Sequence, residues 1–216
     1  MNAKTFITFI IPTIGRESLK NAIKSLTELK NPDWKALIIF DRIKQNIDTY
    51  IYTNYSNDER IIIYESIIEN TNNFAGTVRN IGLEYCKKIN SEWIGFLDDD
   101  DYLSNDYICK LKEEININKN MEICIFRMGY ENGAILPFKS DKNIIRNKVG
   151  ISFCLKKFII ENDLEIKFKN TPYEDFIFLK ELQTKKYKIV ISSYVTYFVR
   201  TLPYKYNFFP KVLLNF

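Results

Sequence analysis

The order of apolar and polar positions predicts alternating strands and helices through the first hundred residues. Short apolar runs rich in β-branched residues are typical of buried strands, and they lie at 6–11, 36–40, 61–64 and 93–97. Apolar residues also repeat at helical spacing within 19–29 and 76–88. We expect Pro12 to end the first strand. This alternation favours parallel β-α-β units with helices on both faces of the sheet.

The second half of the chain has a less regular pattern. It predicts helices around 108–115 and 176–182, a strand at 122–126, and one or two strands within 188–199. No repeat, low-complexity tract or Pro/Gly-rich linker separates the two halves. The sequence therefore predicts the α/β fold class, with a mostly parallel central sheet flanked by helices, in a single domain over residues 1–216.

Polar residues follow three of the predicted strands at the same end. Thr13 comes after the first strand, Asp41 after the second, and Asp98 to Asp101 after the fourth. In open α/β sheets, ligands bind outside the carboxyl ends of the strands. We therefore expect these side chains to converge at one edge of the sheet.

The aspartate run 98–101 is the strongest chemical signal in the chain. Like charges held close together repel one another and lose hydration, and a divalent cation offsets that cost. Mg²⁺ and Mn²⁺ both prefer carboxylate oxygens together with substrate phosphates. The alternative is a solvated acidic loop before a helix capped by Ser104 or Asn105. An EF-hand loop fails on spacing, and no glycine-rich phosphate loop is present.

Composition excludes several classes of mechanism and partner. Histidine is absent, so a Ser-His-Asp triad, a Cys-His dyad and a histidine-bearing zinc site are impossible. The four cysteines form no C-x-x-C pair and are expected to be free thiols in a reducing compartment. A net charge of +4 without a basic stripe argues against nucleic-acid binding. No secretion signal or membrane span is apparent, so we expect a cytoplasmic protein.

Five short motifs give the chain a family resemblance. They are Ile-Ile-Pro-Thr-Ile-Gly-Arg (10–16), Ile-Ile-Phe-Asp (38–41), Gly-Thr-Val-Arg-Asn-Ile-Gly (76–82), Phe-Leu-Asp-Asp-Asp-Asp (96–101) and Tyr-Glu-Asp-Phe (173–176). In this order and at this spacing the chain resembles family 2 of the GT-A-fold glycosyltransferases. The resemblance implies a GT-A, Rossmann-like fold, with residues 1–101 binding a nucleotide-sugar and residues 102–216 binding the acceptor.

The resemblance also implies roles for residues at the strand ends. Pro12 and Thr13 would line a base pocket, Asp41 would accept a hydrogen bond from the uracil of a UDP-sugar, and Arg79 would lie near the base and the aspartates. Asp98 and Asp100 match the ends of an Asp-x-Asp motif and would hold Mn²⁺ or Mg²⁺, with Asp101 in support. The remaining candidate donor contacts are Arg16, Asp99 and Arg200. The family commonly has Asp-Gly-Ser after the first strand-end aspartate, whereas this chain has Arg-Ile-Lys at 42–44, which leaves the base open between uridine, guanosine and thymidine.

The motif at 173–176 supplies a candidate catalytic base. Thr171, Pro172 and Glu174 have the spacing of a capping box, which predicts a helix that begins at Pro172 and gives Glu174 a structural role. The family resemblance makes Asp175 the general base that deprotonates the acceptor hydroxyl. The reaction it implies is an inverting transfer of a hexosyl or deoxyhexosyl group to a glycan or another hydroxyl acceptor.

The sequence alone does not decide the roles of Arg200 and of the segment Tyr204–Lys211, and it leaves two other functions open. Arg200 is a candidate phosphate contact or an ordinary surface arginine. The aromatic and basic segment Tyr204–Lys211 is core, an acceptor-side lid, or a contact with a membrane surface. The alternatives to a transferase are a non-catalytic module that binds nucleotide-sugars or glycans, and a metal-dependent nucleotidyltransferase.

Overall fold

The computed structural model describes residues 4–41, 54–55, 57–66, 74–141 and 143–200. The Arg-Ile-Lys sequence at 42–44 and the segment Tyr204–Lys211 lie outside these described residues. Within the described residues, no helix is both long enough and apolar enough to cross a membrane. All four cysteines are free, as expected, and three of them are buried.

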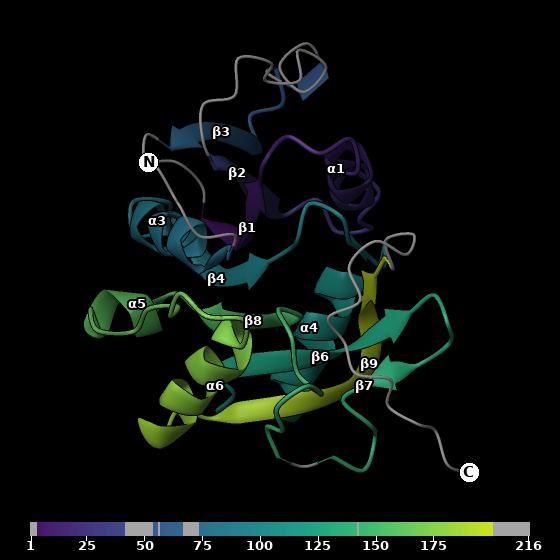
Figure 1. Cartoon of the computed structure of the whole chain (residues 1–216), viewed down its shortest axis with the longest axis vertical. Coiled ribbons are helices and arrows are strands. Elements are labelled where there is room, and N and C mark those ends of the chain that lie inside the picture. The colour runs from purple at the N-terminus through teal and green to yellow at the C-terminus, as the bar shows by residue number, and fades with distance from the viewer. Residues whose placement is uncertain (1–3, 42–53, 56, 67–73, 142, 201–216) are drawn as a thin grey trace.

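A single nine-stranded sheet runs through the described part of the chain (Figure 1). Its order is β3-β2-β1-β4-β8-β6-β9-β5, and β7 pairs with β6 off this path. The strands are β1 (Thr5–Thr13), β2 (Trp34–Asp41), β3 (Ile61–Ser66), β4 (Ser91–Phe96), β5 (Tyr102–Leu103), β6 (Ile123–Tyr130), β7 (Ile135–Leu136), β8 (Phe153–Lys156) and β9 (Ile189–Val199).

The predicted α/β class is confirmed, and parallel pairing is confined to two groups of strands. Strands β3, β2, β1 and β4 are parallel neighbours, as the β-α-β pattern predicts. In the second half, β6 and β9 are parallel, whereas β8 is antiparallel to both β4 and β6. Strand β8 therefore joins the parallel half of the sheet to a mixed half, and the sheet is continuous between them.

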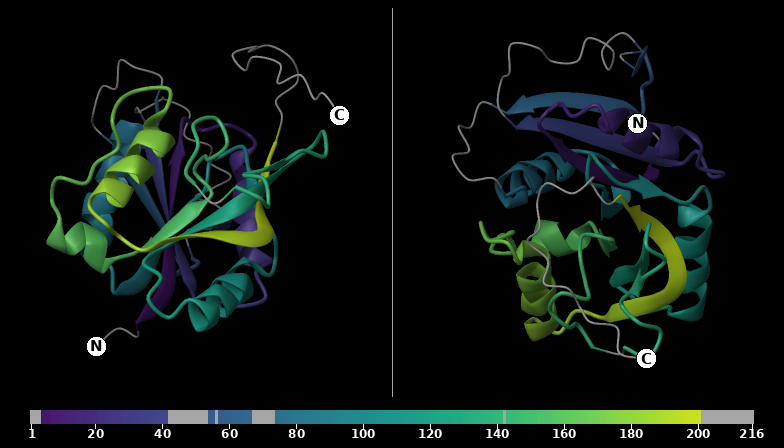
Figure 2. Two further views of the ribbon diagram at one scale, coloured as in Figure 1. Left: turned by 90° about the horizontal axis from the view of Figure 1, so that it is seen from below. Right: turned by 45° about the vertical axis from the view of Figure 1, so that its right-hand side comes forward.

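Helices cover both faces of this sheet (Figure 2). The helices are α1 (Leu19–Thr27), α3 (Gly76–Cys86), α4 (Tyr107–Ile117), α5 (Phe158–Asn162) and α6 (Glu174–Thr184). On one face, Tyr107 of α4 packs edge-on against Phe9 of β1, with their ring centroids 5.4 Å apart. On the other face, Phe178 of α6 lies 5.7 Å from Phe153 of β8. These ring contacts hold α4 and α6 against opposite faces of the sheet.

The prediction that Pro12 ends the first strand is wrong. Strand β1 continues to Thr13, with Pro12 opposite Ile39 of β2. The pairing of β1 with β4 ends earlier, at Ile10 and Phe96. Proline lacks an N–H and is tolerated where a strand has a partner on one side only, as β1 has at this point. The extra two residues carry Thr13 to the edge of the sheet where β4 also ends.

Candidate functional site

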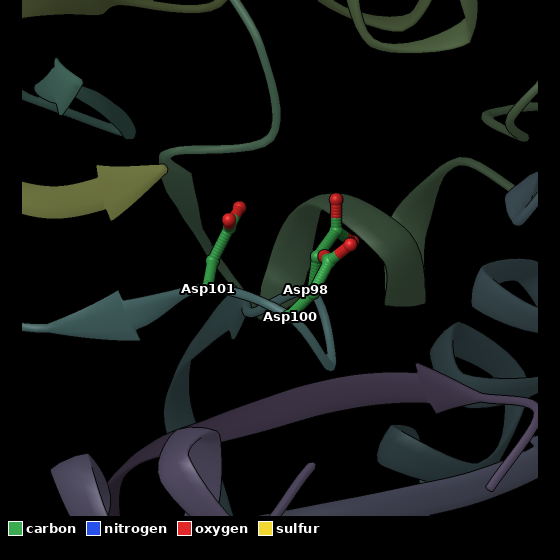
Figure 3. Close-up of side chains that lie close together, drawn as sticks. All are labelled: Asp98, Asp100 and Asp101. Carbon is green, nitrogen blue, oxygen red and sulfur yellow. The ribbon is translucent and has the colours of Figure 1, made fainter. Parts of the chain in front are cut away.

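The aspartate run folds into a tight turn directly after β4. The amide of Asp101 donates to the carbonyl oxygen of Asp98 at 3.2 Å, which brings the two ends of the run together. Carboxylate oxygens of Asp98, Asp100 and Asp101 lie within 4.8 Å of one another. Figure 3 shows the three side chains pointing to the same side of the turn. The predicted pair Asp98 and Asp100 thus gains a third member, Asp101.

Asp99 is not part of this cluster, and its carboxylate fastens the turn to β1. The hydroxyl of Thr13 donates to Asp99 at 2.6 Å, and the same hydroxyl accepts from the amide of Gly15 at 2.9 Å. Burial raises the pKa of Asp99, while Thr13 and Arg16 oppose that rise. Thr13 and Asp99 therefore have a structural contact that holds the turn at the end of β1.

Arg16 lies over the aspartate turn from the loop after β1. One terminal nitrogen of its guanidinium bonds to both Asp99 (3.0 Å) and Asp100 (2.9 Å). The Arg16 side chain is 44% exposed, so it has room to move, whereas Asp99 is buried. Gly15 precedes it with φ +80°, a conformation that glycine adopts without strain. Arg16 therefore places a positive charge next to the carboxylates of the aspartate turn.

A second arginine lies at the centre of the site. Arg79 of α3 is buried and contacts three carboxylates: it donates to Asp98 at 2.5 Å, to Asp175 at 3.3 Å and to Glu174. Burial alone would lower the pKa of Arg79, but the three carboxylates raise it above its ordinary value. Its guanidinium therefore stays charged and joins the end of β4 to the start of α6.

The capping role predicted for Glu174 is wrong. Helix α6 begins at Glu174 rather than Pro172, and no side chain caps its amino end. Glu174 instead turns inward, because the buried guanidinium of Arg79 requires carboxylate partners. Asp175 is only partly buried and lies one position further round the helix. Its carboxylate contacts Arg79, which in turn contacts Asp98 of the aspartate cluster.

The carboxylates of this site are crowded, and their pKa values show it. Burial raises the pKa of Asp100 to about 6, with Asp98 adding to the rise. Burial also raises the pKa of Glu174 to about 7 and that of Asp175 to about 6, against the opposing charge of Arg79. The pKa of Asp101 is raised as well, by burial first and then by Asp98. The site therefore contains more negative charge than its arginines compensate.

The other predicted donor contacts lie around this centre with less definite geometry. Pro12 and Asp41 are buried at the carboxyl ends of β1 and β2, as expected. Arg200 meets the site through its backbone, since its amide donates to Asp101 at 3.0 Å, while the residue as a whole is exposed. These three assignments to the donor remain predictions.

An aromatic residue that the sequence pattern did not indicate also shapes the turn. The hydroxyl of Tyr197, in β9, accepts from the amide of Asp98 at 3.1 Å, and the Tyr197 side chain is fully buried. Strand β9 thereby supports the aspartate run from a position 99 residues further along the chain. Its apolar neighbours gave the expected strand, but nothing in a local pattern indicates this contact.

Comparisons with known proteins identify the family of the chain. A sequence model of glycosyl transferase family 2 matches residues 8–153, which include the strand ends, Arg79 and the aspartate turn. The chain belongs to glycosyl transferase family 2. The expected family of glycosyltransferases is thereby confirmed. A relative from Haemophilus influenzae, named an uncharacterized glycosyltransferase, is 28% identical over 176 residues, which cover 72% of this chain and 68% of that protein.

Solved structures support the GT-A fold of this family 2 member. Residues 1–349 of S. aureus TarS superpose with a TM-score of 0.71 at 17% identity, covering 91% of this chain. The TarS structure in complex with UDP-GlcNAc gives a TM-score of 0.72 at 18% identity, covering 92% of this chain. The chain spans about 60% of the length of the first of these TarS structures. At such identities the likeness shows the fold.

The crowded carboxylates lead to a prediction about pH. The folded-state pKa values of Asp100, Glu174 and Asp175 are raised above their ordinary values. Protonation of these groups therefore favours the folded state, and that contribution is lost as pH rises through about 6 to 7. We expect the metal-free protein to be less stable at pH 8 than at pH 5 by more than about 2 kcal/mol, or about 4–8 °C in Tm.

Thermal melts in the presence of a chelator measure this difference in stability. Asp100→Asn removes one titrating group and should flatten the dependence, whereas a wild-type Tm that is flat or rises with pH would contradict the prediction.

Proposed function

We propose that this family 2 protein transfers a sugar from a UDP-sugar to a hydroxyl acceptor with a divalent cation as cofactor. One observation carries the proposal: a cluster of three aspartates and a partly exposed carboxylate, Asp175, are joined through the single buried side chain of Arg79. The cluster lies at the sheet edge where nucleotides bind in open α/β folds. Asp175 supplies a candidate base beside it.

The aspartate cluster fits a divalent cation by its chemistry. It offers oxygen ligands, which Mg²⁺ and Mn²⁺ prefer. Asp98, Asp100 and Asp101 would hold the ion, and the raised pKa values of Asp100 and Asp101 mark the negative charge that it would offset. When bound, such an ion acts as a Lewis acid that neutralises the diphosphate leaving group.

The donor is assigned to residues 1–101 by family resemblance and position. Pro12, Thr13 and Asp41 lie at neighbouring strand ends, next to the aspartate turn, where a nucleoside would be held. UDP and UDP-GlcNAc are the ligands of two TarS structures with the same fold, which favours uridine for this chain. Residues 102–216 then bind the acceptor, since they supply Asp175.

The chemical step rests on Asp175. Its pKa of about 6 leaves it ionised at neutral pH, and it retains enough basicity to take a proton from an acceptor hydroxyl. That oxygen attacks the anomeric carbon from the face opposite the diphosphate. The new glycosidic bond forms as the bond from the anomeric carbon to the diphosphate oxygen breaks, so UDP leaves and the configuration inverts. Arg79 keeps Asp175 in place and lowers the repulsion between it and Asp98.

A binding screen tests the donor and the cation together. We expect UDP with Mn²⁺ to raise the Tm, by the equivalent of about 2.7 kcal/mol at one hundred times the Kd. UDP without Mn²⁺ should give less, and Asp100→Ala should abolish the Mn²⁺-dependent part. Asp163→Ala is the matched control, because Asp163 pairs with Lys185 outside the site. GDP and TDP are included for comparison. No response to any nucleotide in the wild type would overturn the proposal.

A further inference from the structure

One buried guanidinium fixes the distance between the two halves of the site. Arg79 contacts Asp98 at the end of β4 with one terminal nitrogen, and it contacts both Asp175 and Glu174 at the start of α6 with the other. The side chain of Arg79 is 3% exposed and therefore has no water to replace a lost partner. A shift of Arg79 would move Asp175 relative to the aspartate turn.

The three carboxylates around Arg79 differ in what else they can reach. The side chains of Asp98 and Asp175 are 33% and 24% exposed, so each can turn to a ligand. The side chain of Glu174 is 10% exposed and is directed inward. When Asp98 and Asp175 are engaged by ligands, Glu174 is the carboxylate that stays on Arg79.

The fold makes room for Glu174 at one glycine. A methyl group on Gly76, the first residue of α3, would lie 2.5 Å from Glu174 Oε2 and 3.0 Å from the carbonyl oxygen of Lys169. Contacts this short cannot be accommodated unless Glu174 moves, because the backbone at Lys169 blocks the other side. Gly76 therefore lets Glu174 reach Arg79.

We propose that Glu174 is a positioning residue that holds Arg79, and through it Asp175, at a fixed place relative to the donor site. The inference rests on the proposed function, because it needs Asp175 to act on an acceptor. Glu174 touches neither substrate nor the reacting atoms. Its contribution is to the chemical step and not to donor binding, since a small misplacement of a catalytic group lowers the rate without weakening ground-state contacts elsewhere.

Two variants disturb this contact by different means. Glu174→Gln removes the charge, and Gly76→Ala displaces the carboxylate by steric contact. For each we expect kcat to fall by about 10- to 100-fold, measured as UDP release from the UDP-sugar that stabilises the wild type, with water as the hydroxyl acceptor that takes the sugar. We expect the KM for that UDP-sugar and the Kd for UDP with Mn²⁺ to stay within about twofold of wild type.

Matched controls separate positioning from loss of stability. A methyl group on Gly82, in the same helix, would lie 2.5 Å from Ile10 in the apolar core, so the loss of Tm in Gly82→Ala shows what an overpacked glycine of α3 costs in stability and is compared with the loss in Gly76→Ala. Glu114 is a buried glutamate on α4 that accepts from Ser192 at 2.7 Å, so Glu114→Gln is the control for loss of a buried charge.

The outcomes distinguish the two proposals. An active wild type with full kcat in both Glu174→Gln and Gly76→Ala would overturn the positioning role and leave the proposed function intact. A loss of UDP binding that accounts for the whole effect would also overturn it. A wild type that binds UDP but releases none from any UDP-sugar would overturn the transferase proposal first, and with it the role of Glu174.

Discussion

Replacing Asp175 by asparagine is expected to lower turnover by about 10²- to 10⁴-fold, the contribution that general base catalysis supplies. The amide keeps the shape of the side chain and can still contact Arg79, but it cannot take a proton from the acceptor. The proposed donor contacts lie on the other side of Arg79, so donor binding should persist. UDP release gives the rate, and thermal shifts with UDP and Mn²⁺ give the binding.

The same variant discriminates between a transferase and a binding module. A module that only holds nucleotide-sugars has no use for a base, so Asp175→Asn would change nothing in it. Full UDP release by Asp175→Asn would exclude Asp175 as the base. The control is Glu181→Gln, further along the same helix, which should behave as the wild type does.

Removing the guanidinium of Arg79 is expected to cost about 3–5 kcal/mol of stability at pH 8, as the loss of one partner from a buried ion pair does. Arg79→Met keeps most of the side-chain volume but leaves Glu174, Asp98 and Asp175 without a counter-charge. For a chain of this length the loss corresponds to about 6–20 °C in Tm. Thermal or urea unfolding in chelator measures it.

A surface arginine supplies the control for that measurement. Arg60 pairs with Asp58 at 2.7 Å and lies over the ring of Trp34, but its side chain is 35% exposed. Arg60→Met should cost no more than about 1 kcal/mol, as exposed ion pairs do. Equal losses of unfolding free energy in the two variants would show that the ion pairs of Arg79 contribute no more than an exposed pair does. The loss in Arg79→Met should also shrink at pH 5, where the carboxylates take up protons.

Local patterns were sufficient for the first half of the fold because each strand there carries a continuous apolar run. The runs at 36–40 and 93–97 became β2 and β4 with small changes at the ends. Strand β8 was missed, although Phe153–Lys156 joins the two halves of the sheet. Its four residues are too few for periodicity to distinguish a buried strand from other apolar sequence.

Some residues of the candidate site could be predicted from the sequence, and others could not. Residues at strand ends, such as Thr13 and Asp98, could be predicted to converge because parallel strands end at a common edge. The role of Glu174 could not, because the local spacing fits a helix cap, while the buried charge of Arg79 lies 95 residues away. Tyr197 is likewise a contact between distant segments.

The pairing of Arg16 with Asp99 and Asp100 bears on the order in which ligands enter the site. A divalent ion arriving alone at Asp100 would have to displace the guanidinium of Arg16, so its binding would gain little free energy. An ion arriving with a diphosphate would bring an anion to which the released guanidinium of Arg16 could turn. We therefore expect the free protein to discriminate against bare metal ions and to admit nucleotide and metal as one unit.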